Sequence, residues 1–184
     1  MSTFVRGAQG PIAKFSKSDA TALTNLADQL IAMLEDRANE DRATGDRAAE
    51  SAVGSAANLL LAQLGIGGSE HAPGDPALAR LLPDAYRNDA SSASEHRLLT
   101  ELGLVERKVA NARVVITTLL TKNCLLGSAA VQSWLRTLTD LRLIVATRLQ
   151  ITEDGDEGIG DEVMLEVYEW LGYLQGTLIE CIEL

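Results

Sequence analysis

Several kinds of residue are scarce in this sequence, and each shortage excludes some classes of protein. The 184 residues include 2 Cys, 2 His and only 4% aromatic residues. Few aromatics beside abundant Ala and Leu favour packed helices over a β-sandwich. Two cysteines are too few for the disulfide framework of a small secreted protein. No apolar run reaches the roughly 18 residues that a membrane span needs, and no apolar secretion signal opens the chain, so we expect a cytoplasmic protein without a membrane partner.

Lys and Arg are absent from residues 151–184, and all of the net charge lies there. Ten acids fall in this segment, while the other 16 acids are balanced by the 16 bases of residues 1–150, so the segment alone accounts for the formal charge of −10. An acidic segment repels phosphate and attracts basic surfaces. We therefore take three of its acids as candidates for docking a protein partner: Glu162, Glu166 and Glu169. A homodimer is left open.

Apolar residues recur at spacings of three and four along most of the chain, which predicts amphipathic helices. Such stripes lie within residues 18–34, 53–64, 91–119, 128–149 and 161–178, and a short helix follows Pro76. Two short extended pieces joined by a Gly-Pro turn are compatible with a β-hairpin in residues 1–15. The expected fold class is mainly α: a single-domain bundle of about five to six helices over residues 1–184, ending in an acidic turn and terminal helix at 151–184.

Residues 35–50 are rich in charge, and Ala is their only apolar residue type. A segment that cannot bury apolar area is either a solvated helix or a mobile link, and Gly45 favours the mobile link. Polar residues just before each apolar stripe predict the helix starts. The expected starts are Ser18 or Asp19, Asp75, the serines from Ser91, and Ser128.

Residues that could carry catalysis are not grouped in the sequence. His71 and His96 have no partner at the spacing of a metal ligand or a general base. Residues 65–69 lack the Lys-Ser/Thr of a phosphate-binding loop, and the acidic turn 154–158 lacks the Gly and Glu that a calcium loop needs. We therefore expect no catalytic residue, no metal site and no cofactor, and an enzyme ranks last among the functions considered.

The two cysteines are candidates for redox chemistry. Cys124 lies in a break between two predicted helices close to Lys122, where a cation favours the reactive thiolate. Cys181 follows the apolar stripe of the last helix and is expected on or beside its buried face, with Glu180 and Glu183 disfavouring the thiolate. Cys124 is then the attacking sulfur. Whether the two bridge depends on a Cα separation below about 7 Å.

Five segments of the chain carry a family resemblance: Asp75–Tyr86, Lys108–Val115, Trp134–Arg142, Thr147–Ile151 and Tyr168–Gln175. Together they resemble the actinobacterial AosR family of oxidative-stress regulators, long described as a domain of unknown function. The resemblance covers the order of elements along nearly the whole chain. It is most specific in the first and third of these segments.

The resemblance implies a cytosolic, redox-responsive transcription regulator. Such a protein would act with a stress sigma factor to induce a cysteine-biosynthesis operon and would sense oxidant through an intramolecular disulfide, for which this chain has Cys124 and Cys181. Because unassisted DNA binding normally needs several Lys or Arg contacts to phosphate, DNA is expected to be reached only through that protein partner. A competing hypothesis is a helical adaptor or structural interaction protein, such as a helper near proteolysis machinery, with inert cysteines.

Overall fold

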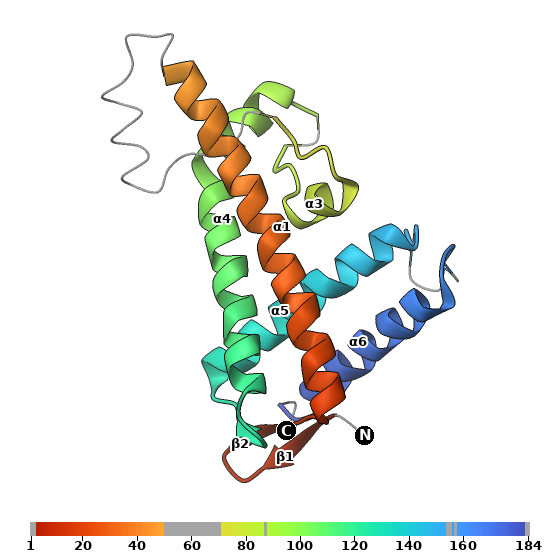
Figure 1. The fold of residues 1–184 in the computed structure, drawn as a ribbon. Coiled ribbons are helices and arrows are strands. Elements are labelled where there is room, and N and C mark those ends of the chain that lie inside the picture. The colour runs from red at the N-terminus through yellow and green to blue at the C-terminus, as the bar shows by residue number, and fades with distance from the viewer. Residues whose placement is uncertain (1–2, 50–70, 87, 154–155, 157, 183–184) are drawn as a thin grey trace. The chain divides into compact units, whose positions relative to one another are not determined.

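The computed structural model of the chain describes residues 3–49, 71–86, 88–153, 156 and 158–182. Its elements, labelled as in Figure 1, are in chain order β1 (Thr3–Gly7), β2 (Gly10–Lys14), α1 (Lys17–Ala49), α3 (Pro76–Leu81), α4 (Ala90–Leu119), β3 (Cys124–Leu125), α5 (Ser128–Arg148) and α6 (Glu162–Glu180). The described residues are mainly helical and include the N-terminal hairpin, so the predicted fold class is confirmed. The predicted helix at 53–64 and the loop at 65–69 lie outside the described residues.

The chain divides into two compact units. Unit 1 consists of Met1–Ile31 and Ala110–Leu184, and unit 2 consists of Ala32–Val109. Unit 1 therefore holds the three strands, α5 and α6, whereas α3 belongs to unit 2. The expectation of one domain over residues 1–184 stays a prediction.

The sheet of unit 1 has three antiparallel strands in the order β1-β2-β3. Gly10 begins β2 with a φ of 137°, a backbone conformation that favours glycine, and so allows the tight turn of the hairpin. The sequence did not predict β3, which pairs with β2 so that Cys124 lies opposite Ala13 and Leu125 lies opposite Ile12. The break expected between the two helices is thus in part a strand.

One face of this sheet packs on helices through aromatic rings. Strand alternation directs Phe4 and its cross-strand neighbour Ala13 to this face, and both are buried. The ring of Trp134 in α5 lies 5.0 Å from the Phe4 ring, edge to face, and stacks at 5.5 Å on Phe15. The indole Nε1 of Trp134 donates to Thr118 Oγ1 at 2.9 Å. Aromatic packing therefore fixes the hairpin to α5, and one neutral hydrogen bond joins α5 to α4.

Helix α6 packs against α5 and β1 through the C-terminal half of its apolar stripe. The fully buried members of that stripe are Leu171, Leu174 and Leu178. Val163 was also expected on the buried face, but it is exposed. The reason is that the stripe is covered only where α6 meets α5 and β1, so its first turn projects beyond the packed part.

Unit 2 contains a cluster of buried charges. Arg37 in α1 donates from Nε to Glu101 Oε1 in α4 at 2.8 Å, and a second donor of Arg37 reaches the backbone oxygen of His71 at 2.7 Å. Arg97 forms ion pairs with both Glu101 and Asp84. Arg37, Arg97 and Glu101 are all buried. Unit 2 is therefore held together at this point by paired charges.

The cluster explains why the expectation of a mobile link at residues 35–50 differs from the structure. Helix α1 continues through this segment to Ala49. Its beginning is not solvated all round, because Arg37 and Ala38 are buried and Arg37 has a carboxylate partner. A charged residue can thus anchor a helix that its apolar content alone does not support.

Helix starts agree with the expected positions to within a few residues. Asp75 accepts a hydrogen bond from the backbone of Ala77, as a cap of α3 should. In α1, however, Ser16 accepts from the backbone of Asp19, so the cap precedes the expected pair. Asp89 takes the place expected of the serines at α4 by accepting from the backbone of Ser91 and Ser92. Gly127 precedes α5 without a side-chain cap, and Ser128 is the first helical residue.

Candidate functional site

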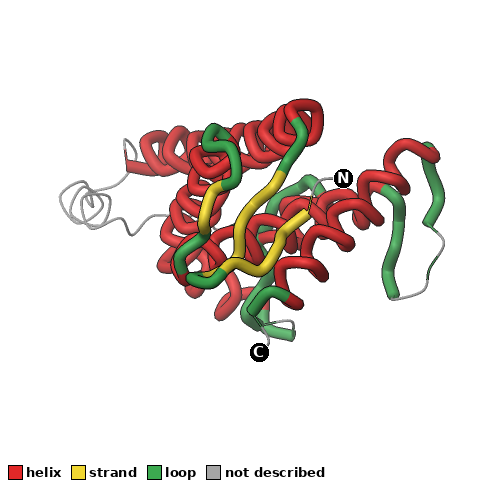
Figure 2. The backbone as a smooth tube through the Cα atoms, turned by 90° about the horizontal axis from the view of Figure 1, so that it is seen from below, coloured by secondary structure: helices red, strands yellow, loops and turns green. Residues whose placement is uncertain are grey.

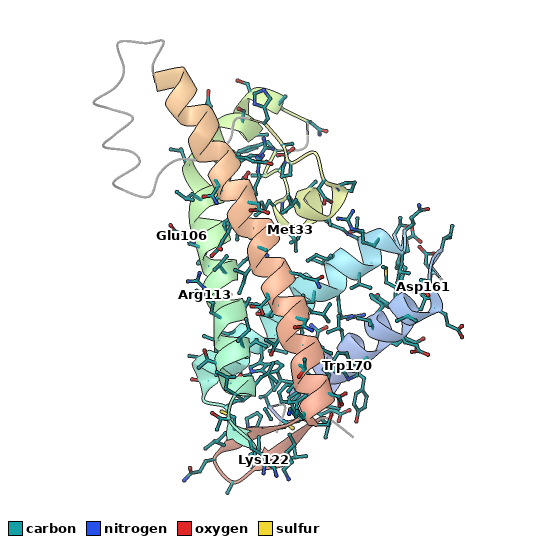
Figure 3. The ribbon with its side chains drawn as sticks, viewed as in Figure 1. Met33, Glu106, Arg113, Lys122, Asp161 and Trp170 are labelled. Atoms are coloured by element: carbon teal, nitrogen blue, oxygen red, sulfur yellow. The ribbon has the colours of Figure 1, made fainter. Side chains whose placement is uncertain are left out.

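Cys124 sits at the outer edge of the sheet, in the two-residue strand β3. The strand follows a turn beside the sheet, in which Asn123 adopts a positive φ of 54° and Lys122 is exposed (Figure 3). The thiol is half-buried, and its Sγ lies 3.7 Å from the backbone oxygen of Leu125. Because Cys124 lies opposite Ala13, its side chain is directed to the same face of the sheet as Phe4.

Cys181 is the residue that ends α6. Its backbone N–H donates to Leu178 at 3.1 Å, and its thiol is half-buried rather than part of the core. Burial raises the pKa of the Cys181 thiol, the positive charge of Arg6 lowers it, and the negative charge of Glu180 raises it. The net shift is upward, which is the direction expected for Cys181 from the sequence. Burial is its largest cause, and Glu180 is a smaller one.

Arg6 links the helix end that carries Cys181 to the sheet. Its guanidinium donates to the backbone oxygen of Glu180 at 2.8 Å, and the contact is exposed to solvent. This link was not predicted, because the two residues are 174 positions apart and a backbone acceptor leaves no trace in the sequence. The contact between the C-terminal end of α6 and β1 therefore includes a solvent-exposed hydrogen bond.

The two thiols lie near different strands of the sheet. Cys124 in β3 is separated from β1 by β2, which at roughly 4.8 Å per strand spacing places it about 10 Å from Phe4. Cys181 is close enough to Arg6 of β1 for the Arg6 charge to affect its pKa. A disulfide requires Cα atoms within about 7 Å. Both cysteines are free in this structure, and the fold brings them to the same sheet without placing them in bonding contact.

The three docking candidates form an exposed stripe on α6. Glu162, Glu166 and Glu169 are spaced by four and three residues, so they share one face of the helix, and all three are exposed. Asp161 caps the helix by accepting from the backbone of Val163, and the nearby acids suit the positive end of the helix dipole. We call Glu162, Glu166 and Glu169 the acidic stripe.

A contact between α5 and α6 escaped the sequence analysis. The guanidinium of Arg142 lies 4.8 Å from the centre of the Tyr168 ring and donates to the Tyr168 hydroxyl and to Gln175 Oε1. Gly172 faces the guanidinium carbon across the helix interface. The sequence does mark these residues in one way, because they belong to two of the segments that carry the family resemblance. Arg142 therefore orients α6 on α5.

His71 and His96 are both exposed; His96 contacts Thr100 and the ring of Tyr86. Among residues whose placement is described, no three His, Cys, Asp or Glu side chains could together hold a metal ion. The carboxylate of Asp156 accepts three hydrogen bonds from Thr152 and Glu153, which makes it the centre of a local turn.

The same described residues contain no helix that is both long and apolar enough to cross a membrane.

Comparisons with known proteins agree with the family resemblance. The oxidative stress regulator AosR of Mycobacterium tuberculosis H37Rv is 29% identical over 180 residues, which cover 88% of this chain and 77% of the relative, and the protein of the same name from Mycobacterium bovis gives the same values. A putative oxidative stress regulator AosR of Mycobacterium leprae is 29% identical over 131 residues, covering 61% of this chain and 60% of that relative. No solved structure matches the chain significantly.

These relatives support a role as a regulator in oxidative stress. The family model described as "Domain of unknown function (DUF2017)" matches residues 1–182. That match covers almost the entire sequence, including both units, the sheet and both cysteines. The chain therefore belongs to the DUF2017 family.

Proposed function

We propose that the protein is a non-enzymatic, redox-responsive transcription regulator of the cytoplasm, which acts with a stress sigma factor on cysteine-biosynthesis genes. The names of its relatives support the regulatory part of this proposal. The observation that carries the redox part is the presence of two free, half-buried thiols, one on strand β3 and one at the helix end that is bonded to β1 of the same small sheet. The sigma factor and the genes come from the family resemblance.

The proposed reaction joins Cys124 to Cys181. A hydroperoxide oxidises the Cys124 thiolate to a sulfenic acid and is itself reduced to water or an alcohol. The Cys181 sulfur then attacks the sulfenic sulfur, the S–S bond forms, and hydroxide leaves to become water. Cys124 begins the reaction because burial raises the pKa of Cys181 and slows its ionisation.

This disulfide requires movement, which is what makes it a switch. Cys124 is on β3, whereas Cys181 ends a helix whose terminus is bonded to β1, so we expect either the α6 terminus to leave β1 or β3 to leave β2. The α6 terminus is the expected moving part, because its link to Arg6 is an exposed hydrogen bond. A change in the position of α6 alters the position of the acidic stripe and therefore its binding to a basic surface of the partner. DNA is reached through that partner.

Peroxide treatment followed by mass analysis without reductant tests the proposal. The wild type should lose the mass of two hydrogen atoms and form a Cys124–Cys181 linked peptide pair, reversibly on reduction. The variants Cys124→Ser and Cys181→Ser form a matched pair, since neither can bridge but only Cys181→Ser should retain a sulfenic acid that dimedone traps. Free thiols at oxidant doses that stress cells would show that the switch is wrong. So would partner binding by peroxide-treated Cys124→Ser that is the same as that of the peroxide-treated wild type.

The adaptor function remains the second candidate, because the acidic stripe is already exposed with both thiols free. It predicts capture of a basic partner with equal affinity in reductant and in oxidant. A binding measurement with the oxidised and reduced wild type therefore separates the two functions. Charge reversal of Glu166 weakens binding in both.

A further inference from the structure

The outer face of the sheet carries a row of apolar side chains. Val5, Ile12 and Leu125 are direct cross-strand neighbours on the three strands, and alternation directs them away from the buried Phe4 row. Leu125 is 46% exposed. In Figure 2 this face is turned to the viewer, and no other described element of unit 1 lies in front of it. Unit 1 therefore presents an apolar row in which Leu125 is exposed and Val5 and Ile12 are half-buried.

Lysines border this row. Lys14 is two residues from Ile12 on the same strand, so it shares the outer face, and it is exposed. Lys122 is exposed in the turn that leads into β3, beside the sheet (Figure 3). Residues 1–18 and 110–139 of unit 1 contain bases but no Asp or Glu. We call this surface the basic sheet face, made of Val5, Ile12, Lys14, Lys122 and Leu125.

A second uncovered apolar surface lies at the start of α6. Ile159 is 72% exposed, Val163 is 63% exposed and Met164 is 37% exposed. The exposed acids Glu162 and Glu166 lie among them. Neighbouring exposed apolar side chains with a polar border mark interaction surfaces more often than scattered ones do. We call this surface the acidic helix start.

The two surfaces complement each other in both charge and polarity. Each combines apolar side chains with exposed charges of one sign, and the signs are opposite. Complementary charge steers association and fixes register, while burial of the apolar side chains supplies affinity. A nucleic acid would satisfy the lysines of the basic sheet face but would leave its apolar row without a matching surface, so a protein partner fits better.

The two surfaces cannot meet within one chain. The C-terminal end of α6 is the end that contacts β1, through Arg6 and Glu180. The 19 residues of α6 make a helix about 28 Å long at 1.5 Å per residue, and the acidic helix start is at the far end. In Figure 3, Asp161 and Lys122 accordingly lie at opposite ends of the arrangement formed by α6 and the sheet, both of which belong to unit 1.

We infer that the basic sheet face docks the acidic helix start of a second copy of this chain. A pair related by a two-fold axis makes this contact twice, because each copy supplies one surface of each kind. The contact includes Glu162 and Glu166, which also belong to the acidic stripe. Self-association and docking of a basic partner on that stripe therefore exclude each other.

Sedimentation of the full chain in reductant tests this inference, and the reductant keeps disulfide chemistry out of the result. The wild type should shift toward twice its monomer mass as concentration rises, and added salt should reverse the shift because exposed charges are screened. The variants K14E/K122E and E162K/E166K should each weaken self-association by at least about tenfold, since like charges then face each other.

Mixing the two variants gives the sharpest result. One copy then offers an unchanged acidic helix start to an unchanged sheet face, and the two reversed surfaces also attract each other. The mixture should recover association that neither variant shows alone. The variants R107E/R136E and E95K/E106K reverse the same number of exposed charges elsewhere and should associate like the wild type.

Any one of the following outcomes would overturn the inference. The wild type is monomeric at every concentration and salt; the mixed variants do not recover association; or the control variants weaken association as much as the surface variants do. Variants whose thermal unfolding matches that of the wild type are folded, so loss of structure cannot imitate the expected result. Loss of oligonucleotide binding in K14E/K122E with unchanged self-association would also contradict it and would assign the face to nucleic acid.

Discussion

Each unit has an arginine that joins distant parts of the chain, and the chemistry of the two contacts differs. In unit 2 the buried Arg37 bridges α1 and α4 through the buried carboxylate of Glu101, at 8% and 3% exposure respectively. In unit 1 the half-buried Arg142 bridges α5 and α6 through Tyr168 and Gln175, both of which are neutral. A guanidinium can therefore be desolvated beside an opposite charge or beside an aromatic ring and an amide.

The difference concerns what happens when a partner is lost. Removing one member of a buried ion pair leaves an uncompensated charge, which is among the costliest single changes in a protein. Removing a neutral acceptor from a half-exposed guanidinium leaves a group that water can still reach. The Arg37–Glu101 contact of unit 2 should thus resist opening, whereas the Arg142 contact of unit 1, the unit that carries both cysteines, can be exchanged at lower cost.

The largest expected effect is that of Glu101→Gln, which leaves the buried Arg37 and Arg97 without their shared carboxylate. We expect it to lower the free energy of unfolding by about 3–5 kcal/mol, measured by chemical denaturation. Glu95→Gln, on an exposed turn of the same helix, should stay within about 0.5 kcal/mol of the wild type. A loss below about 1 kcal/mol for Glu101→Gln would mean that unit 2 does not depend on the ion pair.

Arg142→Met should have a smaller effect, because methionine keeps much of the apolar contact with Tyr168. The loss of the cation–π contact and of two hydrogen bonds should cost about 1–2 kcal/mol in the same denaturation experiment. Arg142→Lys serves as the comparison, since it keeps the charge but not the planar group. If Arg142→Met costs as much as Glu101→Gln, the contrast between the two units is wrong.

Replacement of helical glycines should stabilise both units. A Cβ at Gly103 of α4 would meet nothing within 4 Å, and one at Gly172 of α6 would lie 3.5 Å from the Arg142 guanidinium, which is ordinary van der Waals contact. Gly103→Ala and Gly172→Ala should each raise the free energy of unfolding by up to about 1 kcal/mol through helix propensity. Destabilisation by Gly172→Ala alone would show that Arg142 needs a closer approach to α6.

The smallest effects concern two exposed carboxylates, one from each unit. Hydrogen bonds from the Ser92 hydroxyl and backbone lower the pKa of Asp89 below its ordinary value of 3.8, and those from the backbone of Thr152 and Glu153 lower the pKa of Asp156. Because both pKa values are depressed in the folded state, their stabilisation is present above the ordinary value and is lost as the pH falls through the lowered one.

Carboxyl titrations followed by NMR check these directions. Ser92→Ala should raise the pKa of Asp89 clearly, since that hydroxyl is the largest cause of its shift. Thr152→Val should move Asp156 less, because the hydroxyl of Thr152 contributes less than the two backbone donors. Equal responses to the two substitutions would contradict this assignment of causes.

The sequence predicts most of the fold because helices leave a local record. The stripes of α1, α4, α5 and α6 are read directly from apolar spacing, and the Asp75 cap follows from its position before Pro76. Caps at Ser16 and Asp89 were misplaced by a few residues, since neighbouring polar residues compete for the same backbone donors. The predicted burial of Val163 was wrong, because the spacing of apolar residues does not show how far along a helix the neighbouring elements cover its apolar face.

The candidate site is less predictable, because it depends on contacts between distant residues. Two-residue β3 has no periodicity of its own and exists because β2 offers it a partner. The bond from Arg6 to the end of α6 and the Arg142 contact both join segments that only the folded chain brings together. The exposure of Glu162, Glu166 and Glu169 was predictable, since charge on one face of an amphipathic helix indicates solvent.

Helices α1 and α4 both run through the boundary between the units. The boundary falls between residues 31 and 32 in α1 and between 109 and 110 in α4, in the interior of each helix. A fragment that stops at either point leaves a severed helix with unpaired backbone groups at its new end. Neither unit is therefore an exchangeable module: truncation, domain swapping in the laboratory and recombination between genes can preserve both helices only by moving the two units together.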